Sequence, residues 1–271
     1  MSRSSPLRAL AALAALAAAA CATLSAQAAG PSASSTADGR LVDQSKVLNG
    51  GVSAGDAPGF PLTLSEPGLY RLTGNLTVSD PNLDAVQITA DGVTLDLNGY
   101  SIVGPVSCTG SGAQLNCAPT PASGVGVRAS QRQVTVRRGT IRGFGAGVLA
   151  GALSRVEDMS ISHMNGTGIA AGATSAVARN VVNQTMVGIQ SWGLVRDNVV
   201  SGARNVGIGL IAPGIASGNL VTGGGGTGLQ LPSGTAAAFN VLTLNDGLAV
   251  SGQGLSLGDA NTNLCGAATK C

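Results

Sequence analysis

A glycine followed by an aliphatic residue recurs along the second half of this 271-residue chain, at intervals of 19 to 21 residues. The seven pairs are Gly126-Val127, Gly147-Val148, Gly168-Ile169, Gly188-Ile189, Gly207-Ile208, Gly228-Leu229 and Gly247-Leu248. A fixed period of this length is typical of a solenoid, in which each coil buries its apolar face only by stacking on its neighbours. The repeat therefore restricts the fold to a stack of similar coils.

A second set of positions, most of them asparagine, keeps the same period. Its members are Asn98, Arg138, Asp158, Asn180, Asn198, Asn219 and Asn240. Asparagine tolerates the left-handed backbone of tight turns, and stacked amides can bond one another as a ladder. We therefore predict a structural ladder formed by the five asparagines of this set. The same alignment places Arg138 and Asp158 in adjacent coils, where they could pair.

The coils are predicted to consist of strands. Short β-branched runs such as Val134-Thr135-Val136 and Val199-Val200 are separated by Gly, Asn and Ser, and apolar residues alternate with polar ones. This period-two pattern is typical of strands with one buried face, whereas leucine-rich repeats need dense leucines and usually carry a helix. We predict an all-β fold, a single-stranded parallel β-helix of about eight coils.

Residues 1–28 have the pattern of a secretory signal peptide: Arg3 and Arg8, an Ala/Leu-rich stretch, and a small-x-small cleavage site at Ala26-Gln27-Ala28. The apolar stretch is too short for a comfortable membrane span. Cys21 suggests a rival interpretation, lipidation, but no large aliphatic residue stands three positions before it. We expect an exported protein, periplasmic or extracellular.

Without the two arginines of the signal, the 15 basic residues become 13 and equal the 13 acidic ones. A balanced charge gives no general attraction to nucleic acid, so we expect no nucleic-acid partner. We also expect no membrane span, and a monomer.

Four cysteines remain after the signal, as two close pairs: Cys108 with Cys117, and Cys265 with Cys271. An even number in an exported chain favours disulfides over metal ligation, and local pairing is the favoured connectivity. The first bridge would hold an insertion over residues 105–123, and the second would hold the tail. We predict four segments: the signal peptide (1–28), a flexible N-terminal segment and cap (29–58), the β-helix domain (59–258) and a C-terminal tail (259–271).

Residues 59–104 carry a more specific signal. The runs Gly59-Phe60-Pro61-Leu62-Thr63-Leu64, Pro67-Gly68-Leu69-Tyr70 and Asp91-Gly92-Val93-Thr94-Leu95-Asp96-Leu97-Asn98-Gly99 stand there. This stretch resembles the entry segment of bacterial secreted right-handed parallel β-helix repeat proteins of the pectin-lyase-like superfamily. The resemblance implies right-handed coiling, three sheets per coil and an exported location. It implies little about chemistry, because one fold serves many functions.

No catalytic motif is visible in the sequence. Polygalacturonase-type hydrolysis needs paired aspartates, a histidine and an Arg-x-Lys element, and lyase chemistry needs clustered carboxylates that hold calcium. The Asp80–Asp84 segment could bind a cation, but a solvated turn is favoured. His163 could act as a base beside Glu157 or Asp158, but an incidental surface histidine is favoured. Catalytic residues stay unassigned, and we expect no metal or cofactor, since Ca²⁺ has no support.

Two groups of residues are candidates for ligand binding. Arg128, Arg137 and Arg142 belong to an arginine-rich stretch that could present a cationic strip to uronates or sulfated sugars, unless nearby carboxylates neutralise it. Trp192, flanked by Gln190 and Gln230 in the repeat, could stack on a sugar ring whose hydroxyls the amides bind. The alternative for Trp192 is that it merely covers the sheet edge.

These features favour an exported β-helix that binds polysaccharide or serves as an envelope or surface structural module. The alternative is a polysaccharide lyase, hydrolase or epimerase with a divergent site. A third possibility is an adhesive solenoid that recognises protein. An exposed Trp192 in a shallow groove would favour sugar binding, and a compact group of Arg, His and carboxylates in one groove would favour an enzyme.

Overall fold

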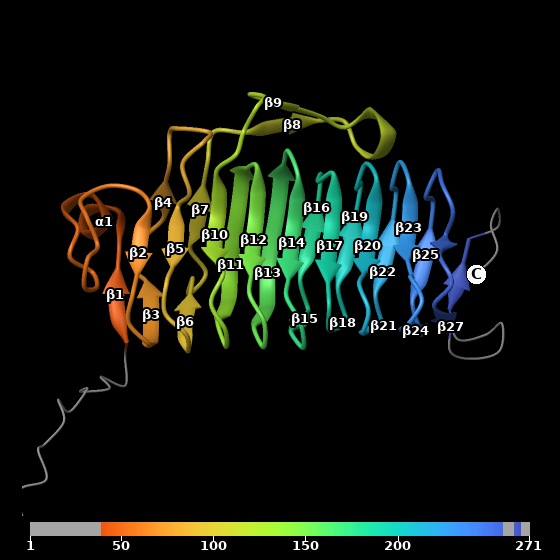
Figure 1. Ribbon diagram of the computed structural model, residues 1–271. Helices are drawn as coiled ribbons and strands as arrows, with labels where there is room; N and C mark the ends of the chain where they lie inside the picture. Colours follow the sequence, from red (N-terminus) through yellow and green to blue (C-terminus); the bar gives the residue numbers. More distant parts are fainter. Residues whose placement is uncertain (1–38, 257–262, 267–271) are drawn as a thin grey trace, which may run out of the picture. The chain divides into compact units, whose positions relative to one another are not determined.

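The computed structural model describes residues 39–256 and 263–266. The strands in this part of the chain pair in parallel with the corresponding strands of neighbouring coils, and only the β8–β9 hairpin is antiparallel (Figure 1). The predicted all-β parallel β-helix is therefore confirmed. The described residues form nine coils, each with one strand in a nine-stranded sheet.

The nine-stranded sheet takes one short strand from every coil. Its strands are β2 (Leu62–Leu64), β5 (Val86–Ile88), β10 (Val125–Ala129), β12 (Ala146–Ala150), β14 (Thr167–Ala171), β17 (Val187–Ser191), β20 (Val206–Leu210), β23 (Thr227–Gln230) and β26 (Val250–Ser251).

The seventeen-stranded sheet contains two arms of each coil, joined at a corner. The first arm consists of β1 (Arg40–Val42), β3 (Gly68–Leu72), β6 (Val93–Asp96), β15 (Ala176–Ala178), β18 (Leu194–Arg196), β21 (Gly214–Ser217), β24 (Thr235–Ala238) and β27 (Leu255–Ser256). The second consists of β4 (Leu76–Thr77), β7 (Ser101–Val103), β16 (Val181–Asn183), β19 (Val199–Ser201), β22 (Leu220–Thr222), β25 (Val241–Thr243) and β28 (Leu264–Cys265). Two longer strands, β11 (Thr135–Phe144) and β13 (Arg155–Met164), run through both arms.

The recurring glycines lie where the nine-stranded sheet meets the second arm. An added Cβ at Gly207 would lie 2.2 Å from Cγ1 of Val221 and 2.6 Å from the carbonyl oxygen of Gly228. Glycine is therefore required by close approach, and the aliphatic residue after it, such as Ile208, is fully buried. The seventh pair does not belong to the column. Leu229 pairs with Val250, which puts Ala249 beside Gly228, and Leu248 is exposed.

The corner between the two arms is a single residue in the left-handed conformation. These residues are Arg138, Asp158, Arg179, Asp197, Gly218 and Phe239, with φ between 57° and 67°. After Arg179, Asp197, Gly218 and Phe239, the next position along the chain holds a buried asparagine: Asn180, Asn198, Asn219 and Asn240. The buried Asn263 continues the set in the following coil by accepting from Asn240. Asn198 illustrates their bonding: its Oδ1 accepts from Nδ2 of Asn180 at 3.0 Å, and its Nδ2 donates to Val177 O and to Asn219 Oδ1, both at 3.0 Å.

The structure corrects the predicted ladder at its N-terminal end. Asn98 is not part of it, because its side chain bonds the carbonyl oxygen of Leu72 instead, at 3.3 Å. Arg138 and Asp158 occupy the corner column rather than the asparagine column. They do not form the ion pair that the alignment suggested: Arg138 pairs with Asp96, and Asp158 pairs with Arg179.

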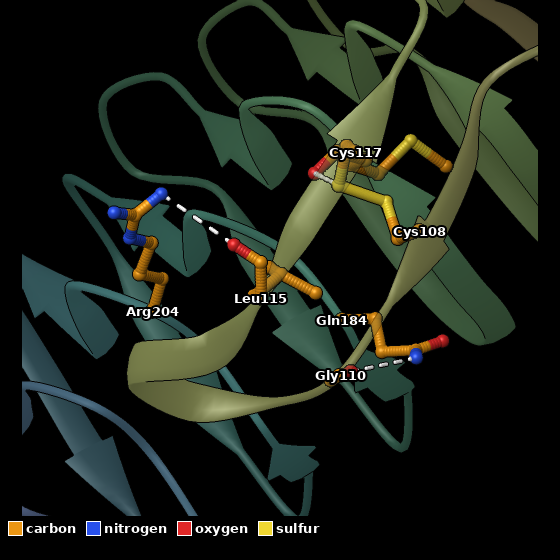
Figure 2. Close-up of a disulfide and its surroundings, with 7 residues drawn as sticks. Cys108, Gly110, Leu115, Cys117, Gln184 and Arg204 are labelled. Atoms are coloured by element: carbon orange, nitrogen blue, oxygen red, sulfur yellow. Dashed lines mark hydrogen bonds between the residues drawn. A yellow bond between two sulfur atoms is a disulfide. The ribbon is translucent and has the colours of Figure 1, made fainter.

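An insertion lies over the turns that lead from the second arm back to the nine-stranded sheet (Figure 1). It contains β8 (Ser107–Thr109), a 3-10 turn (Gly112–Gln114) and β9 (Asn116–Ala118). The predicted Cys108–Cys117 disulfide is confirmed and closes the hairpin (Figure 2). Gly112 donates from its backbone to Gly202 O at 3.1 Å, and Gln184 Nε2 donates to Gly110 O at 3.0 Å. The hairpin is thereby anchored to later coils.

The chain ends differ from the predicted segments. Strand β1 pairs with β3, so the sheet begins at Arg40, within the segment 29–58 that was predicted as a flexible segment and cap. Helix α1 (Gln44–Asn49) follows, with Asp43 capping it by accepting from Lys46 N and Val47 buried in the core. Among the described residues, no helix has the length and apolar character to cross a membrane. The predicted signal peptide (1–28) and Cys271 both lie outside the described residues, so the signal peptide and the Cys265–Cys271 bridge stay predictions.

Candidate functional site

An open groove of about 630 Å³ lies where the first-arm strands β15, β18, β21 and β24 begin. Its lining comes from four successive coils: Thr174, Ser175, Ala176, Trp192, Gly193, Leu194, Pro213, Gly214, Ile215, Gly234, Thr235 and Ala236. A volume of this size falls in the range of small-ligand sites.

The floor of the groove is a column of outward side chains. Register pairs Ala176 with Leu194, Leu194 with Ile215, and Ile215 with Ala236. Leu194 is 36% exposed and Ile215 is 51% exposed, although both are large aliphatic residues. Successive members are one coil apart, about 4.8 Å, so the column forms a continuous apolar track along the stack.

Trp192 lies in the turn beside this track. Its backbone N–H donates to Ala171 O and its carbonyl accepts from Thr174 N, both at 3.2 Å, and the residue is 37% exposed. The neighbouring position must be glycine, because a Cβ at Gly193 would lie 2.1 Å from the carbonyl oxygen of Ser175. The turn therefore holds Trp192 at the groove, where its side chain lines the groove and remains partly exposed.

The polar groups of the groove are mostly occupied by the protein itself. The hydroxyl of Ser175 donates to Gly151 O at 3.1 Å and accepts from Ser154 N at 3.0 Å. The hydroxyl of Thr235 donates to Pro232 O at 2.7 Å. Thr174 is exposed at the rim and has no side-chain hydrogen bond within the described part of the chain.

One charged residue adjoins the track. Arg155 pairs in register with Ala176 and therefore occupies the same outward column, one coil before the groove. It is exposed, and no carboxylate in residues 39–256 or 263–266 pairs with it. The groove thus has an apolar floor and an aromatic side, and an arginine without an ion pair occupies the same column one coil before it.

The predicted arginine strip is not assembled. Arg128 lies on β10 and bonds Asp84 Oδ1 at 3.1 Å. Arg137 and Arg142 both lie on β11 but on opposite sides of the corner at residue 138, and Arg137 pairs with Asp96 at 3.3 Å. The three side chains therefore belong to three separate faces of the coil, and carboxylates neutralise two of them.

The predicted group of Trp192 with two amides is also divided. Gln190 and Gln230 lie in one outward column of the nine-stranded sheet, with Gly209 between them, and neither lines the groove. The residues that do accompany Trp192 are Leu194, Ile215 and Ala236. The alternation of buried and exposed residues within each strand predicts that their side chains point outward. Nothing in the sequence shows which turn lies beside them.

The other candidates give no catalytic arrangement. Glu157 and Asp158 both pair with Arg179, and His163, whose Nδ1 is buried without a partner, contacts neither. Asp80 accepts from Asn82 N at 2.8 Å, while Asp84 accepts from Val125 N at 2.9 Å. Within the described residues, no three His, Cys, Asp or Glu side chains come together as metal ligands.

A charged cluster lies away from the groove, around Asp96, whose side chain is fully buried. Burial raises the pKa of Asp96, but hydrogen bonds from Arg138 and the backbone of Asn98, with the charges of Arg138 and Arg137, outweigh it, and the pKa lies below its ordinary value. Hydrogen bonds from Arg179 likewise lower the pKa of Asp158. These pairs hold the corner together rather than preparing an acid or base.

No protein-family model matches the chain, and a search of the curated proteins finds no match either. Among solved structures, the chain is similar to the A-module of a mannuronan C-5 epimerase from Azotobacter vinelandii, with a TM-score of 0.48 and 14% identity over 70% of this chain and 68% of that one. It is also similar to XylC in complex with xylose, with a TM-score of 0.40 and 8% identity over 68% of this chain.

The chain spans 36% of the XylC chain. At these identities the similarity concerns the fold alone and assigns no residue a role. The fold itself is a parallel β-helix.

Proposed function

We propose that this protein is an exported, non-enzymatic module that binds a glycan in the groove around Trp192. The observation that carries the proposal is an indole ring, 37% exposed, beside an open apolar track. Sugar rings have apolar faces that stack on such a ring, and each aromatic contact contributes about 0.5–1.5 kcal/mol beyond the area it buries.

Export is supported by the predicted signal peptide and by the Cys108–Cys117 disulfide, since disulfides persist in oxidising compartments. The apolar lining needs no metal to hold a sugar face, so we propose binding without metal or cofactor. We also propose that the protein acts as a monomer.

The chain contains a single tryptophan, so its intrinsic fluorescence reports on this groove alone. Titrating the purified protein with neutral and acidic polysaccharides should shift the emission of Trp192 for at least one of them. Addition of EDTA should not change the affinity. Absence of any shift across a broad panel would contradict glycan binding at this groove.

Trp192→Ala removes the reporter, so its affinity is measured by calorimetry. The loss should be roughly tenfold, which corresponds to about 1.4 kcal/mol. Phe239→Ala is the matched control, because Phe239 is an exposed aromatic residue at the corner, outside the groove. The size of the polymer is followed in the same mixtures. Shortening of any polymer would instead favour a polysaccharide lyase or hydrolase.

A further inference from the structure

The groove can stack on the apolar face of a sugar ring but offers few free polar groups to the ring hydroxyls. Sugar hydroxyls are both donors and acceptors, and each one buried without a partner costs free energy. The hydroxyls of Ser175 and Thr235 are already bonded within the protein. The backbone N–H groups of Leu194 and Ile215 donate to Ser175 O and Gly193 O, both at 2.9 Å or less. The floor has little to offer an unsubstituted ring.

What the groove does offer is apolar area with donors at its edge. Leu194, Ile215 and Ala236 form the track, and Trp192 forms one side. Arg155 stands at one end of the same column without an ion-pair partner in the part of the chain that the structure describes. A guanidinium donates hydrogen bonds and accepts none, and the Thr174 hydroxyl at the rim can donate as well.

An apolar surface with donors at its edge matches an acyl ester. Its methyl or alkyl part is apolar, and its oxygens only accept hydrogen bonds. We propose that the groove selects glycans that carry O-acyl groups, such as O-acetylated polysaccharides, over the same glycans without them. The acyl methyl packs on Leu194 and Ile215, the carbonyl accepts from Thr174 at the rim, and the sugar ring stacks on Trp192. This inference rests on the proposed glycan-binding function and names the class of glycan.

The test compares each polymer with its own deacylated form. The probes are acetylated glucomannan, acetylated xylan and acetylated pectin, each before and after mild alkaline deacetylation. The emission of Trp192 is followed during titration with the purified protein. We expect at least one acetylated polymer to bind roughly tenfold more tightly than its deacetylated form, since burial of the methyl groups removes apolar area from water.

Ile215→Ser separates the acyl contact from ring stacking. Ile215 is 51% exposed on the outer face, so the fold should tolerate the change, which circular dichroism verifies. The variant should lose roughly fivefold in affinity for the acetylated polymer and keep its affinity for the deacetylated one. Leu220→Ser is the matched control: Leu220 is an outward aliphatic residue, 36% exposed, of the same coil but beyond the corner. It should leave both affinities unchanged.

The outcomes distinguish this inference from the function on which it rests. Equal affinity for the two forms of a polymer, with dependence on Trp192, overturns acyl selection and leaves glycan binding standing. No binding of any of the six polymers overturns both. A shift of Trp192 emission with the fatty-acid anion laurate, but with none of the polymers, also overturns both and assigns the groove to free acyl chains.

Discussion

The coil corner is held by charge in the early coils and by neutral amides in the later ones. Asp96 pairs with Arg137 and Arg138, and Arg179 pairs with Glu157 and Asp158. From Asn180 onwards, buried asparagines take over and bond one another from coil to coil. The corner residue is left-handed in both regions. The left-handed backbone is therefore common to the early and later corners. The side chains that bond beside it differ: ion pairs in the early coils and asparagine amides in the later ones.

This difference matters for solvent and pH. The guanidiniums of Arg138 and Arg179 are nearly half exposed, so water and salt screen part of their attraction. The amide ladder is buried, carries no charge and does not titrate. The later corner residue Asp197 has one ion pair, with Arg196, and both side chains are exposed. We therefore expect the later coils to respond less to pH and salt than the early coils.

The largest predicted effect is at the ladder. Asn198→Ala removes buried hydrogen bonds of the ladder. Asn180 Nδ2 loses its acceptor, and Asn219 Oδ1 and Val177 O each lose a donor. Each unsatisfied buried group costs about 1–3 kcal/mol, so we expect the variant to lose on the order of 3–5 kcal/mol of unfolding free energy. Urea unfolding of the purified protein measures it.

The control for this change is Asn183→Ala. Asn183 is a partly exposed residue of β16 with no side-chain hydrogen bond in the described residues, and its loss should cost less than about 0.5 kcal/mol. Equal costs for the two variants would show that the ladder does not hold the later coils.

The second prediction concerns a feature that both regions share, the glycine column. Gly207→Ala should cost about 1–3 kcal/mol, because its Cβ would overlap with Val221 and the chain cannot move aside in a packed core. Gly147→Ala in an earlier coil should cost a similar amount, because its Cβ would lie 2.4 Å from Gly168 O.

Gly209→Ala is the matched control within the same strand. Its Cβ would meet nothing nearer than 3.7 Å, so stability should be unchanged or rise by about 0.4–1 kcal/mol through a less flexible unfolded chain. Thermal unfolding compares the three variants. If Gly209→Ala proved as costly as Gly207→Ala, close approach would not explain why the column is glycine.

The sequence predicted the repeat better than its register. Turns of variable length moved Gly247 out of its column, and the early corner residues Arg138 and Asp158 stand one position before the asparagines. Counting residues cannot detect such shifts, because a turn that gains one residue and a strand that loses one leave the period unchanged. The Cys108–Cys117 pairing was predictable, since nine residues separate the two cysteines.

The groove was only partly predictable, for a different reason. Trp192 was identified as a candidate, but its partners Ile215 and Ala236 come from the following coils. The stacking of coils brings these residues together, and no contiguous sequence motif indicates that they are neighbours. The prediction of an arginine strip was wrong because residues close in sequence are separated in space. The corner at Arg138 turns Arg137 and Arg142 to different faces of the coil.

The smallest predicted effect tests whether charge holds the early coils. Asp96→Asn keeps the shape of the side chain but removes the charge that Arg137 and Arg138 share. We expect a loss of about 1–2 kcal/mol at pH 7, less than for a fully buried pair, because both guanidiniums can be hydrated. Asp246→Asn, an exposed aspartate without an ion pair in the described residues, should not change stability.

The pH dependence of the unfolding free energy tests whether the charge of Asp96 causes the loss of stability in Asp96→Asn. Because the pKa of Asp96 is lower in the folded protein than the ordinary value of about 3.9, its charge stabilises the fold above that value. The stabilisation disappears as the pH falls through the folded pKa, where the carboxyl becomes neutral. The gap in unfolding free energy between the wild-type protein and Asp96→Asn should therefore be constant from pH 7 to about pH 5 and narrow below pH 4. The ion pairs that Arg179 forms are present in both proteins, so their contribution cancels in this difference. A gap that persisted unchanged into strong acid would mean that hydrogen bonding and shape at Asp96 hold the corner, as amides do in the later coils, and the contrast between the two regions would no longer be one of charge.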